Sequence, residues 1–171
     1  MKIFLFIICS IPFLAFSQNL TLREIIELQE IKHEKIKESL ISRNWVIIQE
    51  MGGEEFPFGD VRFAFDDESG NCSNSFFIAL QYYKENIQRN RIGFEIPTHE
   101  QYLKYVEELL QLGFERNNVS QNINESWEIY QNNKFYIEAV VRPVDDYFGS
   151  PRTFYDIIIT HLEDPHPSRH K

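Results

Sequence analysis

One short phrase occurs twice in this chain, and it constrains the fold more than any other feature. Leu40–Ile47 reads LISRNWVI and Leu109–Arg116 reads LLQLGFER. Each copy has two aliphatic residues, a short spacer, a residue that tolerates positive φ, and a large aromatic residue. Asn44 and Gly113 are suited to ending a helix in the left-handed conformation, since Gly has no Cβ and Asn is the next most tolerant residue. The phrase therefore predicts the end of a helix and the start of a strand, at two places.

Each copy of the phrase ends a segment that opens with a helix start signal. In Thr21–Glu24 and Thr98–Gln101, a Thr is followed three residues later by Glu or Gln, which is the pattern of a capping box. Aliphatic residues then recur at spacings near three and four, so each segment presents one apolar face. We expect one helix to run up to Asn44 and another to run up to Gly113.

Alternating segments after each helix predict four strands per copy. The expected strands lie near 45–50, 61–66, 75–83, 90–96, 114–120, 125–131, 134–142 and 153–162. The expected fold class is therefore α+β, with two tandem α-β-β-β-β repeats at 20–96 and 97–162, and with antiparallel sheet or sheets that carry the helices on one face. No linker rich in Gly, Ser or Pro separates the copies, so a single domain over 18–164 is expected.

The N-terminus has the pattern of a secretory signal peptide. Residues 1–17 combine Lys2, an apolar run and small residues before the expected cleavage site. The run is interrupted by Pro12 and is shorter than the roughly 20 residues that span a bilayer as a helix. We expect cleavage before Gln18 and an exported protein, periplasmic or secreted, with no stable membrane span. Lipidation at Cys9 and an uncleaved anchor are the alternatives.

The charge of the chain argues against phosphate-rich partners. The sequence has 17 Lys and Arg against 26 Asp and Glu, a formal net charge of −9 that becomes −10 when Lys2 leaves with the signal peptide. Binding to nucleic acid needs a basic face, and the sequence has no Lys and Arg cluster large enough to make one. Cys72 would be the last remaining Cys, so no intramolecular disulfide is expected. Residues 165–171 are expected to form a flexible tail.

Motifs for catalysis or metal binding are not found. The sequence has no nucleophile elbow, zinc-protease motif, phosphate-binding loop or dinucleotide fingerprint. Asp66–Asn71 is acidic, but Gly70 comes one place too early for a calcium loop, so a hairpin loop is expected. Cys72 is expected to be an idle thiol, and the His residues near the C-terminus lie in a polar tail that would not fix ligands. We therefore expect no catalytic residue, no metal and no cofactor.

Strand alternation assigns an apolar side of the sheet to the helices. The residues expected on that side are Phe76, Ile78, Leu80, Tyr82, Ile92, Phe94, Ile96, Phe135, Ile137, Ala139, Val141, Ile157 and Ile159. On the other side, aromatic residues alternate with charges of both signs, which is the composition of a protein-binding surface. The expected partner-binding residues are Phe77, Tyr83, Tyr130, Tyr136, Arg142 and Phe154. The plainer alternative is a solvated sheet with ordinary cross-strand pairs.

The order of a helix and four strands, twice, together with the pair LISRNW and LLQLGF, resembles the secreted β-lactamase inhibitor proteins. The resemblance implies a protein that is not an enzyme and that binds its target through a sheet face. We therefore expect an exported protein-binding module of the inhibitor or immunity type. Two other classes stay open, namely a small-ligand or lipid-binding protein that holds its ligand between helices and sheet, and a small hydrolase.

Overall fold

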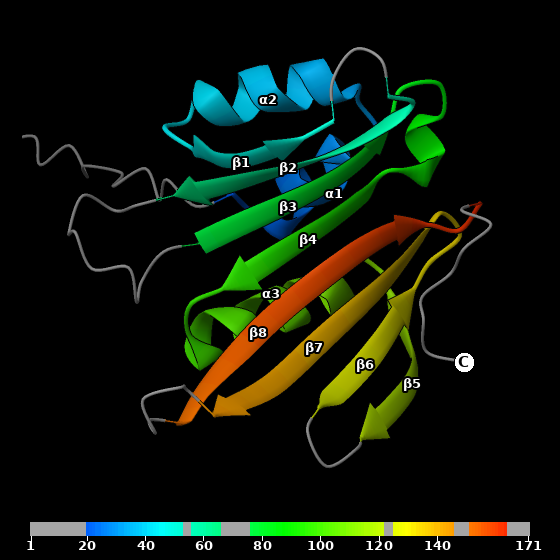
Figure 1. Cartoon of the computed structure of the whole chain (residues 1–171). Coiled ribbons are helices and arrows are strands. Elements are labelled where there is room, and N and C mark those ends of the chain that lie inside the picture. Colours follow the sequence, from blue (N-terminus) through cyan, green and yellow to red (C-terminus); the bar gives the residue numbers. More distant parts are fainter. Residues whose placement is uncertain (1–19, 53–55, 66–75, 122–124, 146–150, 164–171) are drawn as a thin grey trace, which may run out of the picture.

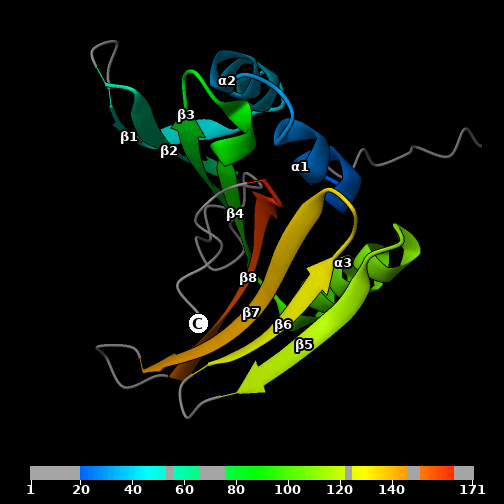
Figure 2. The same ribbon diagram turned by 90° about the vertical axis from the view of Figure 1, so that its right-hand side faces the viewer.

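The computed structural model describes residues 20–52, 56–65, 76–121, 125–145 and 151–163. They form one eight-stranded antiparallel sheet with helices over one face (Figures 1 and 2). The segment expected to be a signal peptide, the acidic loop with Cys72, and the tail at 165–171 lie outside the described residues. Within the described ranges, no helix has both the length and the apolar character that crossing a membrane requires.

The described residues contain three α-helices, which are α1 (Leu22–Leu28), α2 (His33–Ile41) and α3 (His99–Gln111). α1 begins with the predicted capping box, in which the Thr21 side chain accepts from the Glu24 N–H and Glu24 accepts from the Thr21 N–H. α3 begins at Thr98, whose hydroxyl accepts a hydrogen bond from the Gln101 N–H. Both predicted helix starts are confirmed.

Both copies of the repeated phrase end a helix, as predicted. Asn44 has a φ of 66° and Gly113 a φ of 83°. In each copy, the N–H of the aromatic residue donates to the carbonyl of the first aliphatic residue, at 3.1 Å. This hydrogen bond closes a Schellman motif, which satisfies a carbonyl that the helix leaves free. The phrase thus turns the chain from a helix into a strand.

The single helix expected before Asn44 is wrong, because a turn at 29–32 divides it into α1 and α2. The turn brings Gln29 into the core, where it is 2% exposed and its Nε2 donates to the carbonyl of Asn90. Ile31, in the same turn, packs against the core. The turn therefore satisfies a buried carbonyl that a continuous helix would leave without this donor.

The strands are β1 (Val46–Met51), β2 (Phe58–Phe65), β3 (Phe76–Tyr83), β4 (Arg91–Ile96), β5 (Glu115–Gln121), β6 (Ser126–Gln131), β7 (Phe135–Asp145) and β8 (Pro151–His161). A short 3₁₀ helix, η2 (Ile87–Arg89), precedes β4. The strand order in the sheet is β1-β2-β3-β4-β8-β7-β6-β5. Apart from the two at the edges, each strand therefore has a partner on both sides.

The expected fold class of two tandem α-β-β-β-β repeats is wrong, because the described strands form a single sheet and the described helices number three. The pairing of β4 with β8 joins the strands into this sheet, from Arg91 opposite Thr160 to Ile96 opposite Tyr155. Without this pairing, β4 and β8 would each be an edge with a row of unpaired backbone groups. The continuous sheet satisfies those groups.

The helices lie on one side of the sheet. α3 packs against β4 and β8, α2 lies beside β1, and α1 contacts α3. Figure 2 shows the opposite side of the sheet without a covering helix. We call that side the open face, and define it as the strand side chains that point away from the helices.

The residues predicted to face the helices are buried, except that Val141 is half-buried. Aromatic residues from the helices and the sheet interlock in this core. Phe94 meets Tyr105 edge to face, with ring centroids 5.2 Å apart, and the Tyr105 hydroxyl donates to the Leu20 carbonyl at 2.7 Å. Burying one such side chain stabilises the fold by about 1.5–3 kcal/mol. The core therefore fixes which strand side chains reach the open face.

Candidate functional site

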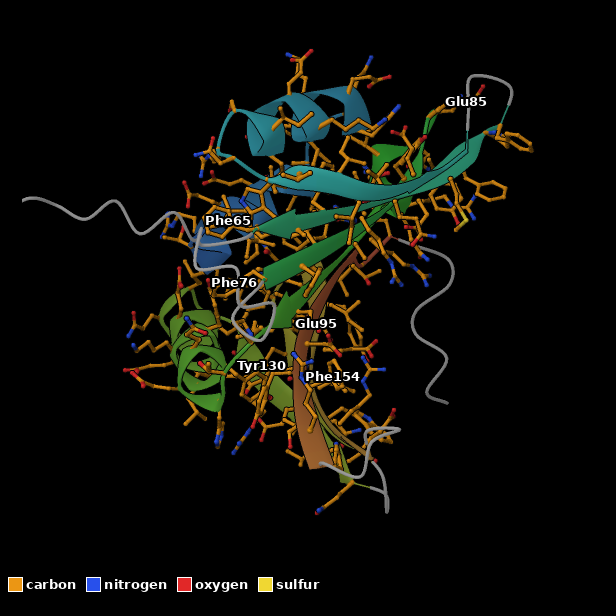
Figure 3. All side chains as sticks on the ribbon, turned by 60° about the vertical axis from the view of Figure 1, so that its left-hand side comes forward. Phe65, Phe76, Glu85, Glu95, Tyr130 and Phe154 are labelled. Atoms are coloured by element: carbon orange, nitrogen blue, oxygen red, sulfur yellow. The ribbon has the colours of Figure 1, made fainter. Side chains whose placement is uncertain are left out.

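Strand register brings three of the predicted partner-binding residues together on the open face. In one row across the sheet, Phe77 lies opposite Glu95, and Glu95 lies opposite Asp156. One step further along, Arg142 of β7 lies opposite Phe154 of β8. Figure 3 shows Glu95 and Phe154 on the side of the sheet away from the helices. Phe77, Arg142 and Phe154 therefore belong to one site, although they come from three strands.

A hollow of about 480 Å³ lies over the middle of the open face. We call it the central hollow, and it is lined by Ile48, Arg62, Phe77, Ile78, Ala79, Gly93, Glu95, Arg142, Arg152, Phe154, Asp156 and Ile158. Its floor is low where Ala79 lies opposite Gly93 and Gly93 lies opposite Ile158. The small side chains at Ala79 and Gly93 are the reason why the sheet is hollowed here.

The charged residues of the central hollow are three Arg and two acids. Arg142 forms an ion pair with Asp156 on the neighbouring strand. Burial raises the pKa of Asp156, and the Arg142 guanidinium opposes that effect in part. Burial, and then the charge of Asp156 opposite, raise the pKa of Glu95. The carboxylates of Glu95 and Asp156 therefore repel each other. The positive charge of Arg142 mainly neutralises that of Asp156.

The other charged groups of the central hollow, Glu95, Arg62 and Arg152, have weaker interactions than the ion pair of Arg142 and Asp156. Within the described part of the chain, the Glu95 carboxylate makes no hydrogen bond or ion pair. The Arg152 guanidinium lies over the ring of Phe154, 5.1 Å from its centroid. Arg62 and Arg152 act on Glu95 through their charge alone. The hollow thus has a half-buried carboxylate on its floor and exposed guanidinium groups at its rim.

Tyr83 lies on the open face but in a second hollow, at the end of β2 and β3. This end hollow, of about 430 Å³, is lined by Met51, Gly52, Phe56, Phe58, Gly59, Asp60, Gln81, Tyr82 and Tyr83. The Arg89 guanidinium covers the Tyr83 ring at 4.3 Å, and the Phe58 ring centroid is 6.3 Å from that of Tyr83. Tyr83 is thus a half-buried residue that lines the apolar end hollow, whereas Arg142 lines the central hollow.

Tyr136 is on the open face but does not line the central or the end hollow. It is half-buried on β7, opposite Gln131 on one side and Thr160 on the other. The six predicted residues therefore do not form one continuous patch.

The placement of Tyr130 on the partner-binding face is wrong. Tyr130 is 1% exposed and lies opposite the core residue Ile137 (Figure 3). Its hydroxyl donates to Glu128, which also pairs with Arg116 at 3.4 Å. Burial, and then the hydrogen bond to Glu128, raise the pKa of the Tyr130 hydroxyl. Because the hydroxyl has a partner on the helix side, the ring can be buried there, and Trp127 and Ile129 point to the open face instead.

Sequence reasoning missed several residues of the two hollows, chiefly Ile48, Phe58, Ala79 and Gly93. One signal was available in RIGFEI, where Gly93 interrupts the apolar and polar alternation of a strand. The apolar exposed residues of β1 and β2 had no comparable signal, because an aliphatic residue in a strand is usually buried.

Within the part of the chain that the structure describes, no three His, Cys, Asp or Glu side chains come together to hold a metal ion. His161 packs edge on against Phe135, with ring centroids 5.5 Å apart. The remaining His residues of the tail lie outside the described residues.

Comparisons with protein-family models, with curated proteins and with solved structures find no match for this chain. The resemblance to secreted β-lactamase inhibitor proteins therefore stays a prediction.

Proposed function

We propose that this is an exported protein of the inhibitor or immunity type, which is not an enzyme and which binds another protein through its open face. The observation that carries the proposal is the central hollow, where Phe77 and Phe154 lie beside the ion pair of Arg142 and Asp156. Aromatic and Arg side chains around a partly desolvated centre are the residues that most often dominate binding between proteins.

Exposed apolar residues around the two hollows support the same proposal. Val46, Ile48 and Met51 on β1 are 61%, 54% and 55% exposed, and Phe56 and Phe58 are each 57% exposed. Apolar area left in water costs roughly 25 cal/mol per Å² relative to burial. A partner that covers these side chains would recover that free energy, and the charges of the central hollow would select which partner fits.

The alternative of a small ligand between helices and sheet has no observation of its own in its favour. Ile25, Ile36 and Leu109, which belong to the layer between helices and sheet, have no exposed area. The central hollow opens on the opposite side.

The test is to isolate a partner from the exported fraction of the source cells and to measure its affinity for variants of two surfaces. Phe77→Ser combined with Phe154→Ser changes the open face. Leu103→Ser combined with Leu110→Ser is the matched control, because both Leu residues are exposed on α3. We expect the open-face variant to lose about 2 kcal/mol or more of binding free energy and the control to bind as the wild type does.

Circular dichroism and thermal melting establish that each variant is folded before binding is compared. Loss of binding in the α3 variant alone would place the contact surface on the helices and would contradict the proposal. Equal binding by both folded variants would show that the open face is an ordinary solvated sheet surface and not a binding site.

A further inference from the structure

Gly93 occupies a position in the sheet where the protein itself has no need of a glycine. It lies inside β4, between β3 and β8, and its φ is outside the left-handed region. A Cβ added to it would come no closer than 3.8 Å to another atom, the Cβ of Ala79. Glycine within a strand destabilises it relative to Ala. A glycine that is required neither by φ nor by space inside the protein leaves room on the open face for a group from outside.

Gly59 gives the opposite case in the same sheet. A Cβ there would clash with the ring and hydroxyl of Tyr82, so this glycine is needed for packing within the protein itself. Gly59 thus makes room for a side chain of the protein itself, whereas Gly93 leaves space on the open face that no side chain of the described residues fills.

The walls around Gly93 favour a flat, apolar group. Ala79 and Ile158 are its direct neighbours across the sheet, and Phe77 lies on the diagonal beside Glu95. All of these side chains line the central hollow. At the rim, guanidinium groups such as that of Arg152, which already lies over the Phe154 ring, suit the face of an aromatic ring.

The charges of the hollow argue against an occupant that is itself charged. Arg142 and Asp156 neutralise each other in their ion pair, so a cation would meet the guanidinium groups of Arg62 and Arg152, and an anion on the floor would meet the Glu95 carboxylate. A neutral hydrogen-bond donor meets neither penalty. The Glu95 carboxylate is half-buried and accepts no hydrogen bond from the described residues, so it is open to a donor from outside the chain.

We propose that the central hollow anchors one tyrosine side chain of the partner protein, with its ring over Gly93 and Ala79 and its hydroxyl donating to the Glu95 carboxylate. The inference rests on the proposed function, because the tyrosine belongs to the protein that the open face binds. The ring is neutral, flat and apolar, and its hydroxyl supplies the donor.

The first experiment uses side-chain probes and needs no identified partner. N-acetyl-L-tyrosinamide is titrated into isotope-labelled protein, and the backbone amide signals of Ala79, Gly93 and Ile158 are followed by NMR. The matched probes are the N-acetyl amides of Phe, Lys and Glu. We expect a probe of this size to bind with roughly millimolar affinity. We expect saturable shifts at these amides, with the Tyr probe bound about fivefold more tightly than the Phe probe and no binding of the Lys and Glu probes.

Tighter binding of the Lys or Glu probe, or equal binding of the Phe probe, would overturn the assignment of a neutral donor. The absence of any saturable shift up to about 20 mM of the Tyr probe would overturn the anchor site itself, because a preformed site for such a ring reaches millimolar affinity.

Two variants separate shape from hydrogen bonding. Gly93→Val fills the floor and should abolish binding of both aromatic probes, and Gly93→Ala, whose Cβ the structure accommodates, shows the same trend with the fold kept. Glu95→Gln should weaken the Tyr probe about fivefold and leave the Phe probe unchanged. Glu115→Gln, at the exposed edge on β5, is the matched control. Unchanged binding of the Tyr probe by Gly93→Val would overturn the inference.

Binding of the isolated partner to these variants distinguishes failure of the proposed function from failure of the tyrosine anchor. A partner that loses affinity for the open-face double variant but binds Gly93→Val as tightly as the wild type would leave the proposed function standing and overturn the tyrosine anchor. A partner that loses affinity of about tenfold or more for Gly93→Val supports both.

Discussion

The two edge strands of the sheet differ in what they expose. β1, with the sequence VIIQEM, exposes Val46, Ile48 and Met51, whereas β5, with the sequence ERNNVSQ, exposes mainly polar and charged side chains. Both edges have a register shift, between Ile47 and Gln49 on β1 and between Arg116 and Asn118 on β5. Such irregularities already discourage an edge from pairing with another chain.

Edge protection does not explain the exposed apolar residues of β1. Ile48 lines the central hollow and Met51 lines the end hollow. Val46 lies opposite Ala64, on the same open face. The β1 edge is therefore continuous with the surface that we propose for a partner, and the β5 edge is an ordinary solvated edge.

The largest effects are expected where each edge strand is attached to the core. Trp45 and Phe114 directly precede β1 and β5, and they are 2% and 5% exposed. Replacing Trp45 by Ala should lower the free energy of unfolding by about 4 kcal/mol, and replacing Phe114 by Ala should lower it by about 3 kcal/mol, because each leaves a cavity. Urea unfolding measures both. A loss below about 1 kcal/mol at either residue would show that this edge is not anchored by its aromatic residue.

The turns before the two edges should respond differently to substitution. Gly113→Val puts a β-branched residue at a φ of 83°, with no atom within 4 Å of the added Cβ, so only backbone strain acts. We expect a loss of about 1–2 kcal/mol in the free energy of unfolding. Asn44→Gly should be nearly neutral, because Gly adopts the same φ without strain. An unchanged melting temperature for Gly113→Val would contradict the left-handed cap.

The apolar edge and the polar edge should differ in partner binding. Ile48→Lys places a charge at the β1 rim of the central hollow, and Val119→Lys places the same charge on β5, where Val119 is 56% exposed. We expect Ile48→Lys to weaken the partner by about tenfold, or about 1.4 kcal/mol, and Val119→Lys to leave binding unchanged. Both should be folded, since surface changes of this kind stay within about 0.5 kcal/mol. An equal loss in both variants would remove the contrast between the edges.

The smallest effect is expected in the pH dependence of stability, at the centre of the sheet. The pKa of Glu95 in the folded protein is raised above its usual 4.5, so the folded state holds this proton more tightly than the unfolded state does. Ionised Glu95 is therefore destabilising at neutral pH, and the penalty fades as the pH falls through the folded pKa toward 4.5.

Glu95→Gln removes this penalty and should raise the melting temperature slightly at pH 7, with the gain disappearing below about pH 4.5. Glu115→Gln, at the exposed β5 edge, controls for the loss of one surface charge. Melting curves measured from pH 4 to pH 8 provide the comparison. A gain that is independent of pH would show that the Glu95 carboxylate is not responsible for it.

The parts of the fold that local chemistry determines were predictable. Thr21, Thr98, Asn44 and Gly113 act through their own backbone and nearest neighbours, and all four were predicted correctly. The break at 29–32 was not predictable, because Gln29 is held by the Asn90 carbonyl, 61 residues away. Whether the strands form one sheet or more was left open by the sequence, because the pairing of β4 with β8 depends on contacts that have no local signal.

The candidate site was predictable in composition more than in arrangement. Alternation placed Phe77, Arg142 and Phe154 correctly on the open face, and the register that joins them could only be seen in the structure. Tyr130 was misplaced because alternation alone does not say which set of β6 side chains faces the helices, Trp127 with Ile129 or Glu128 with Tyr130. The second set does, and Glu128 accepts the hydrogen bond of the buried Tyr130 hydroxyl there.

The sheet order also has a consequence for when the protein can fold. β8, which ends at His161, lies in the middle of the sheet between β4 and β7. During synthesis, β4 is made long before β8 and waits with one side unpaired. The ladder between β4 and β8, from Ile96 opposite Tyr155 to Arg91 opposite Thr160, spans a large sequence separation, whereas β7 and β8 are consecutive strands. Long-range pairing of this kind slows folding. Completion of the sheet must therefore wait until β8 has been made, and truncation within β8 would remove a central strand of the sheet.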